Sequence, residues 1–168
     1  MAFANRGEAY RLLKRYDEAL KDFDRAIELE PTAWRLRQRG QINLSLGRYQ
    51  EALDDFNQSI ELDSETNCKC YLRSIAHQNL NQFNEAQADL QKAIDLAQAI
   101  HAKDSDDWGT IANLGLYHLG AGNPVESDWF YRSLLNAPKE MIEMGIKDLE
   151  ELRELRMVNG ELKRRSRF

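Results

Sequence analysis

Residues that interrupt helices or cross-link the chain are scarce in this sequence. Its 168 residues include only three prolines, nine glycines and two cysteines. Two cysteines cannot build a disulfide framework, so nothing in the sequence requires an oxidising compartment, and we expect a cytoplasmic location. The longest apolar run falls far short of the ~20 residues that span a bilayer, and the first residues lack the apolar core of a secretory signal. With so few breaks, the sequence favours a soluble, nearly all-helical domain.

Neither sign of charge dominates the chain. The 23 basic and 28 acidic residues give a net charge of −5. This mildly acidic balance argues against a role in binding nucleic acid or membrane surfaces. One basic stretch, residues 163–167, lies close to the end of the sequence, and we expect it to be a solvated, frayed tail. Hydrophobic residues make up 42% of the chain, which is enough to bury a core.

The sequence repeats itself at a regular interval. Three segments align, from Gly7 to Leu29, from Gly40 to Leu62 and from Ser74 to Leu96, and the steps between their first residues are 33 and 34. A fourth, weaker copy runs from Asn113 to Leu135, and an insertion of about seven residues precedes it. Periods of this length are typical of solenoids built from stacked helical units.

Within each copy, the apolar residues form two stripes with the period of a helix. In the first copy Phe3, Tyr10 and Leu13 share one stripe, and Phe23 and Ile27 share the next. A short polar break separates the stripes, so each copy is predicted to be a helix–turn–helix pair. Small residues recur where the paired helices would cross closely, and a larger side chain there would overpack the crossing. They are Gly7, Ala19 and Ala26 in the first copy and Gly40, Ala52 and Ser59 in the second.

The stretches outside the regular copies are also expected to be helical. Residues 97–107 are predicted to extend the second helix of the third copy by about two turns, after which residues 104–107 cap the next helix. Residues 137–158 are predicted to form an amphipathic helix that caps the end of the solenoid. Its apolar stripe consists of Met141, Ile142, Ile146, Leu149, Leu152 and Leu155.

Together these features resemble the tetratricopeptide repeat family, whose pattern fixes apolar, small and proline positions along each repeat. The first copy supplies Phe3, Gly7, Tyr10, Ala19, Phe23, Ala26 and Pro31, and the second supplies Leu36, Gly40, Ala52, Phe56 and Ser59. The resemblance implies an all-α, right-handed superhelical solenoid of four helix–turn–helix pairs over residues 1–136. The capping helix at residues 137–158 and the basic tail at residues 159–168 would follow.

No constellation of residues in the sequence indicates catalysis. His77 and His118 fall at equivalent packing positions of the third and fourth copies, and His101 is expected on the surface. Cys68 and Cys70 are two apart, so on a helix they point in different directions, and Cys70 takes an apolar core position. Cys68 has no basic partner nearby in the sequence that would activate a thiol. We therefore predict no enzyme activity, no metal site and no cofactor.

The resemblance implies instead a groove, lined by the first helix of each pair, that holds a peptide or helical segment of a partner protein. The predicted function is that of a non-catalytic protein–protein interaction module. The groove residues are Asn5, Glu8, Trp34, Arg37, Gln38, Gln41, Tyr71, Leu72, Ile75, Gln78, Asn113 and Leu116. Those expected to anchor apolar groups are Tyr71, Leu72, Ile75 and Leu116, while the amides and Arg37 would set the register of the partner. Trp34 and Tyr71 would be strong anchors if exposed; alternatively, each packs on the preceding copy.

Other hypotheses about binding stay open at this point. The last helix could pair with a second copy and make the chain a homo-oligomeric scaffold, or it could fold over the apolar end of the groove. The chain also resembles repeats that grip the carboxylates of chaperone tails, with Asn5 at an amide position of that clamp. The basic pair of the next repeat is replaced by Trp34 and Gln38, with Arg37 only beside them, so the clamp is incomplete.

Overall fold

The structure is a computed structural model that describes residues 2–63, 66–134, 137 and 139. The described residues form eight α-helices and no strand. The helices are α1 (Ala2–Leu12), α2 (Tyr16–Leu29), α3 (Ala33–Ser45), α4 (Tyr49–Leu62), α5 (Asn67–Asn79), α6 (Phe83–His101), α7 (Trp108–Gly120) and α8 (Pro124–Ser133). The helix predicted at residues 137–158 and the tail predicted at 159–168 lie outside the described residues, apart from residues 137 and 139.

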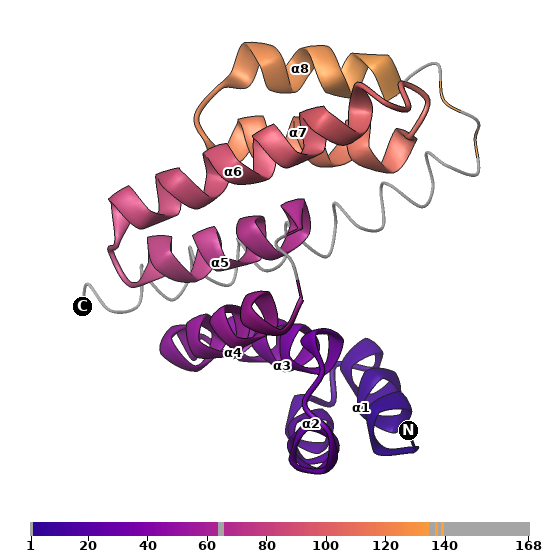
Figure 1. The fold of residues 1–168 in the computed structure, drawn as a ribbon, viewed down its shortest axis with the longest axis vertical. Helices are drawn as coiled ribbons and strands as arrows, with labels where there is room; N and C mark the ends of the chain where they lie inside the picture. Colours follow the sequence, from indigo (N-terminus) through magenta and orange to yellow (C-terminus); the bar gives the residue numbers. More distant parts are fainter. Residues whose placement is uncertain (1, 64–65, 135–136, 138, 140–168) are drawn as a thin grey trace.

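Consecutive helices pack as antiparallel pairs, and the pairs stack. Within the pairs α1 packs on α2, α3 on α4, α5 on α6 and α7 on α8; between pairs α2 contacts α3, α4 contacts α5 and α6 contacts α7. Figure 1 shows the four pairs following one another along the long axis, from α1 and α2 at one end to α7 and α8 at the other. The first helices also meet, because α1 contacts α3 and α3 contacts α5. The predicted all-α solenoid of four helix pairs is confirmed.

The helix ends follow from short polar side chains and from two buried bases. Thr32 and Thr66 precede α3 and α5, and each side chain accepts a hydrogen bond from the backbone N–H three residues later. Arg35 donates to the carbonyl oxygens of Ala26 and Glu30 at the end of α2. Lys69 does the same at the end of α4, where its Nζ lies 3.4 Å from the carbonyl oxygen of Asp63. Of these carbonyl groups, that of Ala26 also accepts the backbone N–H of Glu30, whereas those of Glu30 and Asp63 belong to the residues that follow α2 and α4, where the backbone ladder ends.

The small residues that recur in the repeats lie where the paired helices approach most closely. A Cβ atom built on Gly40 of α3 would lie 2.6 Å from a ring carbon of Phe56 on α4. The equivalent atom on Gly7 would lie 3.2 Å from the ring of Phe23 on α2. Ala19 and Ala52 are fully buried at the same crossings. The glycines therefore let an aromatic ring lie flat against the neighbouring backbone.

The insertion before the fourth pair is only partly helical. α6 has 19 residues against 14 in α4, so it is longer by about one and a half turns, which is less than predicted. The helix ends at His101 because Asp104 forms a local turn, in which its side chain accepts from the backbone N–H of Asp106 at 3.1 Å. Asp107 then caps α7 by accepting from the backbone N–H of Thr110, as the sequence predicted.

Candidate functional site

The predicted groove positions lie on the first helices α1, α3, α5 and α7, and we call the surface they form the inner face. Trp34 is 40% exposed, and Asn5 is also exposed. The half-buried members are Glu8, Arg37, Gln41, Gln78 and Asn113. The remaining five, Gln38, Tyr71, Leu72, Ile75 and Leu116, are buried. The inner face therefore combines a polar, accessible set of side chains with an apolar set that lies within the core.

A polar network joins α1 to α3 on the inner face. The Glu8 carboxylate accepts from Arg11 at 2.9 Å and from the Gln38 amide at 2.7 Å. Burial raises the pKa of Glu8, but the hydrogen bonds from Arg11 and Gln38 and the charge of Arg37 outweigh it, so the pKa lies below its usual value. The Glu8 carboxylate is thus ionised and paired with Arg11, and the Gln38 amide is already engaged.

Arg37 links α3 to α5. Its Nη1 atom lies 3.7 Å from Sγ of Cys68, within hydrogen-bonding distance for sulfur. The sequence analysis considered only basic residues close to Cys68 in the sequence, whereas the repeat stacking brings it beside a residue 31 positions away. The prediction that Cys70 belongs to the core is confirmed, since its side chain is fully buried.

Trp34 both packs on the preceding pair and keeps exposed surface. Its ring meets that of Phe23 edge to face, with the centroids 5.9 Å apart. Phe23 is fully buried and belongs to a separate small core cluster with Ala19, Leu20 and Ile42. Contact with a rigid core residue fixes the indole in place, while 40% of the side chain stays accessible.

The four residues expected to anchor apolar groups lie in the main core. Tyr71, Leu72, Ile75 and Leu116 are each less than 10% exposed and belong to one cluster that also includes Tyr117 and Phe130. The ring of Tyr71 packs against Tyr117 of the fourth pair, with the centroids 4.8 Å apart. Tyr71 is therefore not the exposed anchor that the sequence analysis considered. Its ring contact with Tyr117 joins the third pair to the fourth, and its cluster also includes Leu44 and Phe56 of the second pair.

A ladder of arginine–aspartate pairs, which the sequence analysis missed, fixes the first helix of each pair against the second. Arg6 pairs with Asp22, Arg39 with Asp55, and Arg73 with Asp89. In each case the arginine and the aspartate are 16 positions apart in the sequence. The nitrogen–oxygen distances run from 2.5 to 3.1 Å, and in every pair both carboxylate oxygens are engaged. Forked pairs of this kind are directional as well as charged. The signal was present in the sequence, since both residue types recur with the repeat period.

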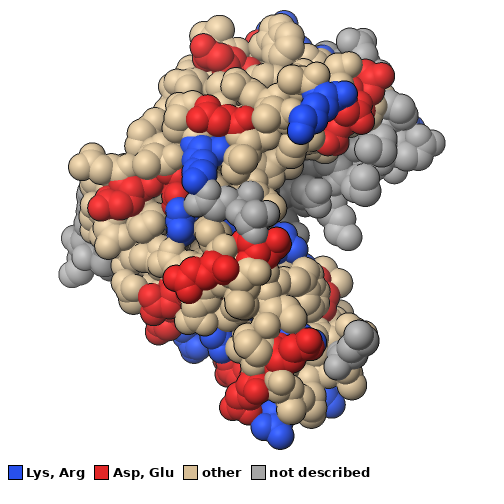
Figure 2. All heavy atoms as spheres, in the orientation of Figure 1, with Lys and Arg blue, Asp and Glu red and all other residues tan. Residues whose placement is uncertain are grey.

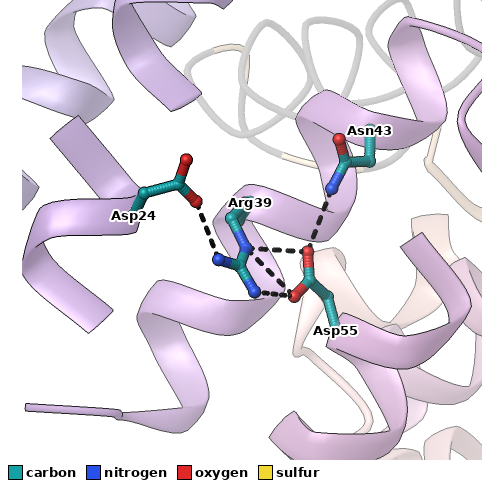
Figure 3. Close-up of polar contacts among 4 residues, drawn as sticks. All are labelled: Asp24, Arg39, Asn43 and Asp55. Carbon is teal, nitrogen blue, oxygen red and sulfur yellow. Dashed lines mark hydrogen bonds and ion pairs between the residues drawn. The ribbon is translucent and has the colours of Figure 1, made fainter. Parts of the chain in front are cut away.

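Arg39 and Arg73 also connect neighbouring helix pairs. Arg39 reaches back to Asp24 on α2 at 2.8 Å, and Arg73 reaches back to Asn57 on α4 at 3.0 Å. Figure 3 shows the Arg39 guanidinium between the carboxylates of Asp24 and Asp55, with the Asn43 amide donating to the far oxygen of Asp55 at 3.1 Å. One arginine thus holds three helices in register.

Burial has different effects on the pKa values of Asp55 and Arg39. Burial between α3 and α4 raises the pKa of Asp55 above its ordinary value, although hydrogen bonds from Arg39 and Asn43 act in the opposite direction. Burial alone would lower the pKa of Arg39, but Asp55 and Asp24 together raise it. The difference arises because the Asp55 side chain is 3% exposed, whereas that of Arg39 is 24% exposed and has two acidic partners.

The ladder ends at the fourth pair. Leu114 and Phe130 take the places of the arginine and the aspartate, and both are buried. His118 corresponds in position to Asn43 and His77, which face the aspartates of their own pairs. Because Phe130 has replaced the aspartate, His118 stacks on its ring at 5.5 Å instead. Both of its ring nitrogens are buried and lack a hydrogen-bond partner among the described residues.

Charge is evenly mixed on the side of the molecule shown in Figure 2. Acidic and basic side chains alternate over its described helices without a continuous area of one sign. A search of the described residues found no cluster of three or more His, Cys, Asp or Glu that could hold a metal ion. Among those same residues, no helix combines the length and the apolar character needed to cross a membrane.

Comparison with protein families identifies the repeats. Models of the tetratricopeptide repeat match residues 1–32, 33–66 and 70–100, more than half of the chain. The chain belongs to the tetratricopeptide repeat family. Members of this family have a fold that serves as a scaffold for protein interaction rather than for catalysis. A search of the curated proteins found no match.

Several solved tetratricopeptide repeat structures are similar to this chain. MamA from Desulfovibrio magneticus RS-1, residues 41 to the end, aligns with a TM-score of 0.56 and 19% identity over 79% of this chain and 72% of its own. A double mutant of the RS-1 protein gives a TM-score of 0.62 and 21% identity over 78% of this chain and 74% of its own. YrrB, a repeat protein with an unusual peptide-binding site, gives a TM-score of 0.54 and 17% identity over 96% of this chain and 90% of its own. At these identities the likeness shows the shared solenoid fold.

Proposed function

We propose that this protein is a non-catalytic interaction module that holds a peptide or helical segment of a partner protein against its inner face. Membership of the tetratricopeptide repeat family supports this role, and so does the peptide-binding site of the similar YrrB structure. The observation that carries the proposal is Trp34, an indole that stays 40% exposed on the inner face while Phe23 holds it in place. Tryptophan is among the residues that most often dominate binding energy.

The accessible polar side chains would set the register of the partner. Arg37, Gln41, Gln78 and Asn113 are half-buried on three successive first helices, and Asn5 extends the set onto α1. Amides can both donate to and accept from the backbone of an extended peptide. The apolar residues predicted as anchors, from Tyr71 to Leu116, lie within the core and act in this proposal by supporting the face.

The inner face does not favour an acidic chaperone tail. Glu8 stays ionised over a wide pH range because its pKa is lowered, and it occupies the Gln38 amide that would face such a tail. Arg11 is paired with the Glu8 carboxylate, so a partner carboxylate would have to compete with Glu8 for this cation. We therefore propose a partner segment that is not held by its carboxylates where it crosses α1 and α3. The two free cysteines are in keeping with the reducing cytoplasm as the place of action.

Capture of partners by the tagged full-length chain tests the proposal. Wild type, Trp34→Ala and Phe83→Ala would be compared by quantitative mass spectrometry of proteins recovered from cells of the source organism. Phe83 is a matched control because it is a 63% exposed aromatic at the start of α6, away from the inner face. We expect Trp34→Ala to reduce recovery of a defined set of proteins at least about ten-fold while Phe83→Ala leaves it intact. Equal recovery by all three proteins would contradict the proposal.

Self-association is the alternative that the apolar stripe of residues 141–155 suggests. Light scattering on the dilute full-length chain separates the two roles. A monomer supports the interaction module. A stable dimer that Leu149→Glu and Leu152→Glu together dissociate would instead support a homo-oligomeric scaffold.

A further inference from the structure

A cavity outside the inner face lies between the end of α6, the following turn and the last helix pair. Its volume is about 250 Å³, and its walls include His101 of α6, Ser105 of the turn, Trp108 of α7, and Trp129 and Phe130 of α8. His101 was expected to be a surface residue, and instead it lines this cavity. We call it the aromatic pocket. It depends on the insertion, because residues 97–107 interrupt the repeat period and supply His101 and Ser105.

The rings of the aromatic pocket stand at steep angles to one another. The planes of Trp129 and Phe130 meet at 85°, with the centroids 4.7 Å apart. The His101 and Phe130 rings meet at 79°, with the centroids 6.2 Å apart. The pocket is therefore walled by aromatic residues of α6, α7 and α8 whose rings do not lie in one plane. Trp129 is 59% exposed, far more than a side chain that serves only the core.

His101 lines the pocket, but its Nδ1 atom is buried and has no hydrogen-bond partner among the residues that the structure describes. Because this atom has almost no accessible surface, it does not face the open pocket. The features that the pocket offers to a ligand are therefore its rings and the charge around it.

The surroundings of the pocket are acidic. In residues 101–108 and 126–133, which provide most of its walls, there are five carboxylates and only two basic side chains. Asp104 and Asp106 flank Ser105, Asp107 precedes Trp108, and Asp128 precedes Trp129. One of the bases, Arg132, is already paired with Asp128 at 2.5 Å. This charge favours a cation over an anion or a neutral group.

We propose that the aromatic pocket binds a cationic alkylammonium group, the side chain of a lysine presented by a partner segment. Aromatic faces attract a cation through their quadrupoles, and the effect is strongest for tryptophan. The neighbouring aspartates would draw a basic segment to the site. This binding is separate from that at the inner face, because Trp34 contacts the first helix pair whereas Trp129 belongs to the last.

The chain carries its own probes for a test. It contains three tryptophans, of which Trp108 and Trp129 line the aromatic pocket and Trp34 lies on the inner face. The indole N–H signals of the ¹⁵N-labelled full-length chain, assigned with single Trp→Phe variants, would be followed during titration with acetyl-Gly-Lys-Gly-amide at constant ionic strength. The matched neutral probe is the same peptide with norleucine in place of lysine.

We expect the lysine peptide to shift the signals of Trp108 and Trp129 saturably while that of Trp34 stays in place. The norleucine peptide should bind at least about five-fold more weakly, because it lacks the charge. Trp129→Ala should weaken binding of the lysine peptide by a similar factor, and Trp34→Ala should not. Far-ultraviolet circular dichroism would check that Trp129→Ala is folded.

Three results would overturn the proposal. Equal binding of the two peptides would make the pocket an apolar site, uniform shifts of all three indoles would mean nonspecific binding, and no shift at Trp108 and Trp129 would exclude the lysine ligand. The two-peptide comparison uses the unaltered chain, so it decides the question even if a variant fails to fold. Its outcome is independent of partner capture through Trp34.

Discussion

Arg39 connects its own helix to two others. It lies on α3, pairs with Asp55 on α4 and with Asp24 on α2, and its guanidinium is only partly exposed. A buried ion pair is weak evidence for stability as such, because taking two charges out of water offsets much of their attraction. Removal of one partner is different, since it leaves the other charge buried and unpaired. In the fourth repeat, buried Leu114 and Phe130 take the positions of the arginine and the aspartate, so apolar side chains can also fill this place.

A double-mutant cycle tests this view of the ladder. We expect Arg39→Leu to lower the free energy of unfolding by about 3 kcal/mol, because Asp55 is left without its main partner. The variant that combines Arg39→Leu with Asp55→Phe, which copies the fourth repeat, should recover most of that loss. Urea denaturation followed by circular dichroism measures both quantities.

The control for that cycle is an exposed pair on the outer surface. Arg25 and Glu28 lie 2.8 Å apart, and both side chains are more than half exposed. Arg25→Ala should therefore change the free energy of unfolding by no more than about 0.5 kcal/mol. If the effects of Arg39→Leu and Asp55→Phe simply added, the two residues would not act as a unit.

Acid should affect two aspartates of the ladder in opposite ways. The hydrogen bond from Arg6 lowers the pKa of Asp22, so its stabilising contribution is present above the ordinary pKa and is lost as the pH falls through the folded-state value. Burial raises the pKa of Asp55, so its contribution is present below the ordinary pKa and is lost as the pH rises through the folded-state value.

These signs give opposite expectations for two matched variants. Between about pH 5 and pH 2, the free energy of unfolding of Asp22→Asn should fall less than that of wild type. Over the same range, the free energy of unfolding of Asp55→Asn should fall more. Urea denaturation at a series of pH values measures both. Parallel pH profiles for the two variants would show that the aspartates share one environment.

At the scale of the elements, the distance between the two helices of a pair depends on the size of one residue at their crossing. A helical Gly→Ala change normally gains about 1 kcal/mol from propensity alone. At Gly40 the added Cβ would lie 2.6 Å from the Phe56 ring, closer than packing tolerates, whereas at Gly7 the nearest ring atom would be 3.2 Å away.

The two glycines should therefore respond differently. We expect Gly40→Ala to destabilise the chain by about 1–3 kcal/mol through overpacking, and Gly7→Ala to fall within about 1 kcal/mol of wild type. Thermal unfolding by calorimetry compares the two variants under one set of conditions. A neutral Gly40→Ala would mean that α3 and α4 can separate without loss.

Most helices could be predicted from the sequence because the repeat period and the apolar stripes are local signals. Tyr16, Tyr49 and Phe83 stand at the same position of their repeats, and each is the first residue of its helix, α2, α4 or α6. The end of α6 could not be placed, since a turn closed by Asp104 competes with helix through hydrogen bonds that periodicity does not report.

The candidate site was less predictable, because family resemblance assigns positions but not exposure. It placed Tyr71 and Ile75 on the inner face, yet their burial depends on how the fourth pair packs, through contacts such as that between Tyr71 and Tyr117. The aromatic pocket joins residues separated by up to 32 positions, from His101 to Ser133, and no local pattern connects them. The arginine–aspartate ladder, by contrast, could have been found from its spacing.

At the scale of the whole molecule, the first helix is the least buried part of the stack. The buried residues of α1 are Ala4 and Gly7, whereas α5 buries seven residues that include Leu72 and Ile75. The main core cluster extends from α3 to α8, and the first pair contributes to a separate, smaller cluster. Stability in such stacks is a sum over units and their interfaces, so it need not be uniform.

Hydrogen exchange should reveal this gradient. We expect amides in the middle of α1 to open with a free energy at least about 2 kcal/mol below those in the middle of α5. Exchange followed by mass spectrometry at near-neutral pH resolves the two helices. Equal protection in α1 and α5 would show that the stack opens as a single cooperative unit.

The end of the arginine ladder after the third pair has a mechanical consequence. The forked bonds hold Arg39 and Arg73 in place within their own helix pairs, and the further bonds of these arginines to Asp24 and Asn57 have a fixed direction and resist rotation of one pair against the preceding one. Leu114 takes the arginine's place in the fourth pair, and an apolar side chain holds its neighbours without an angular preference. Bending stiffness should therefore be unequal along the solenoid, and its elastic compliance should concentrate at the junction of α6 and α7.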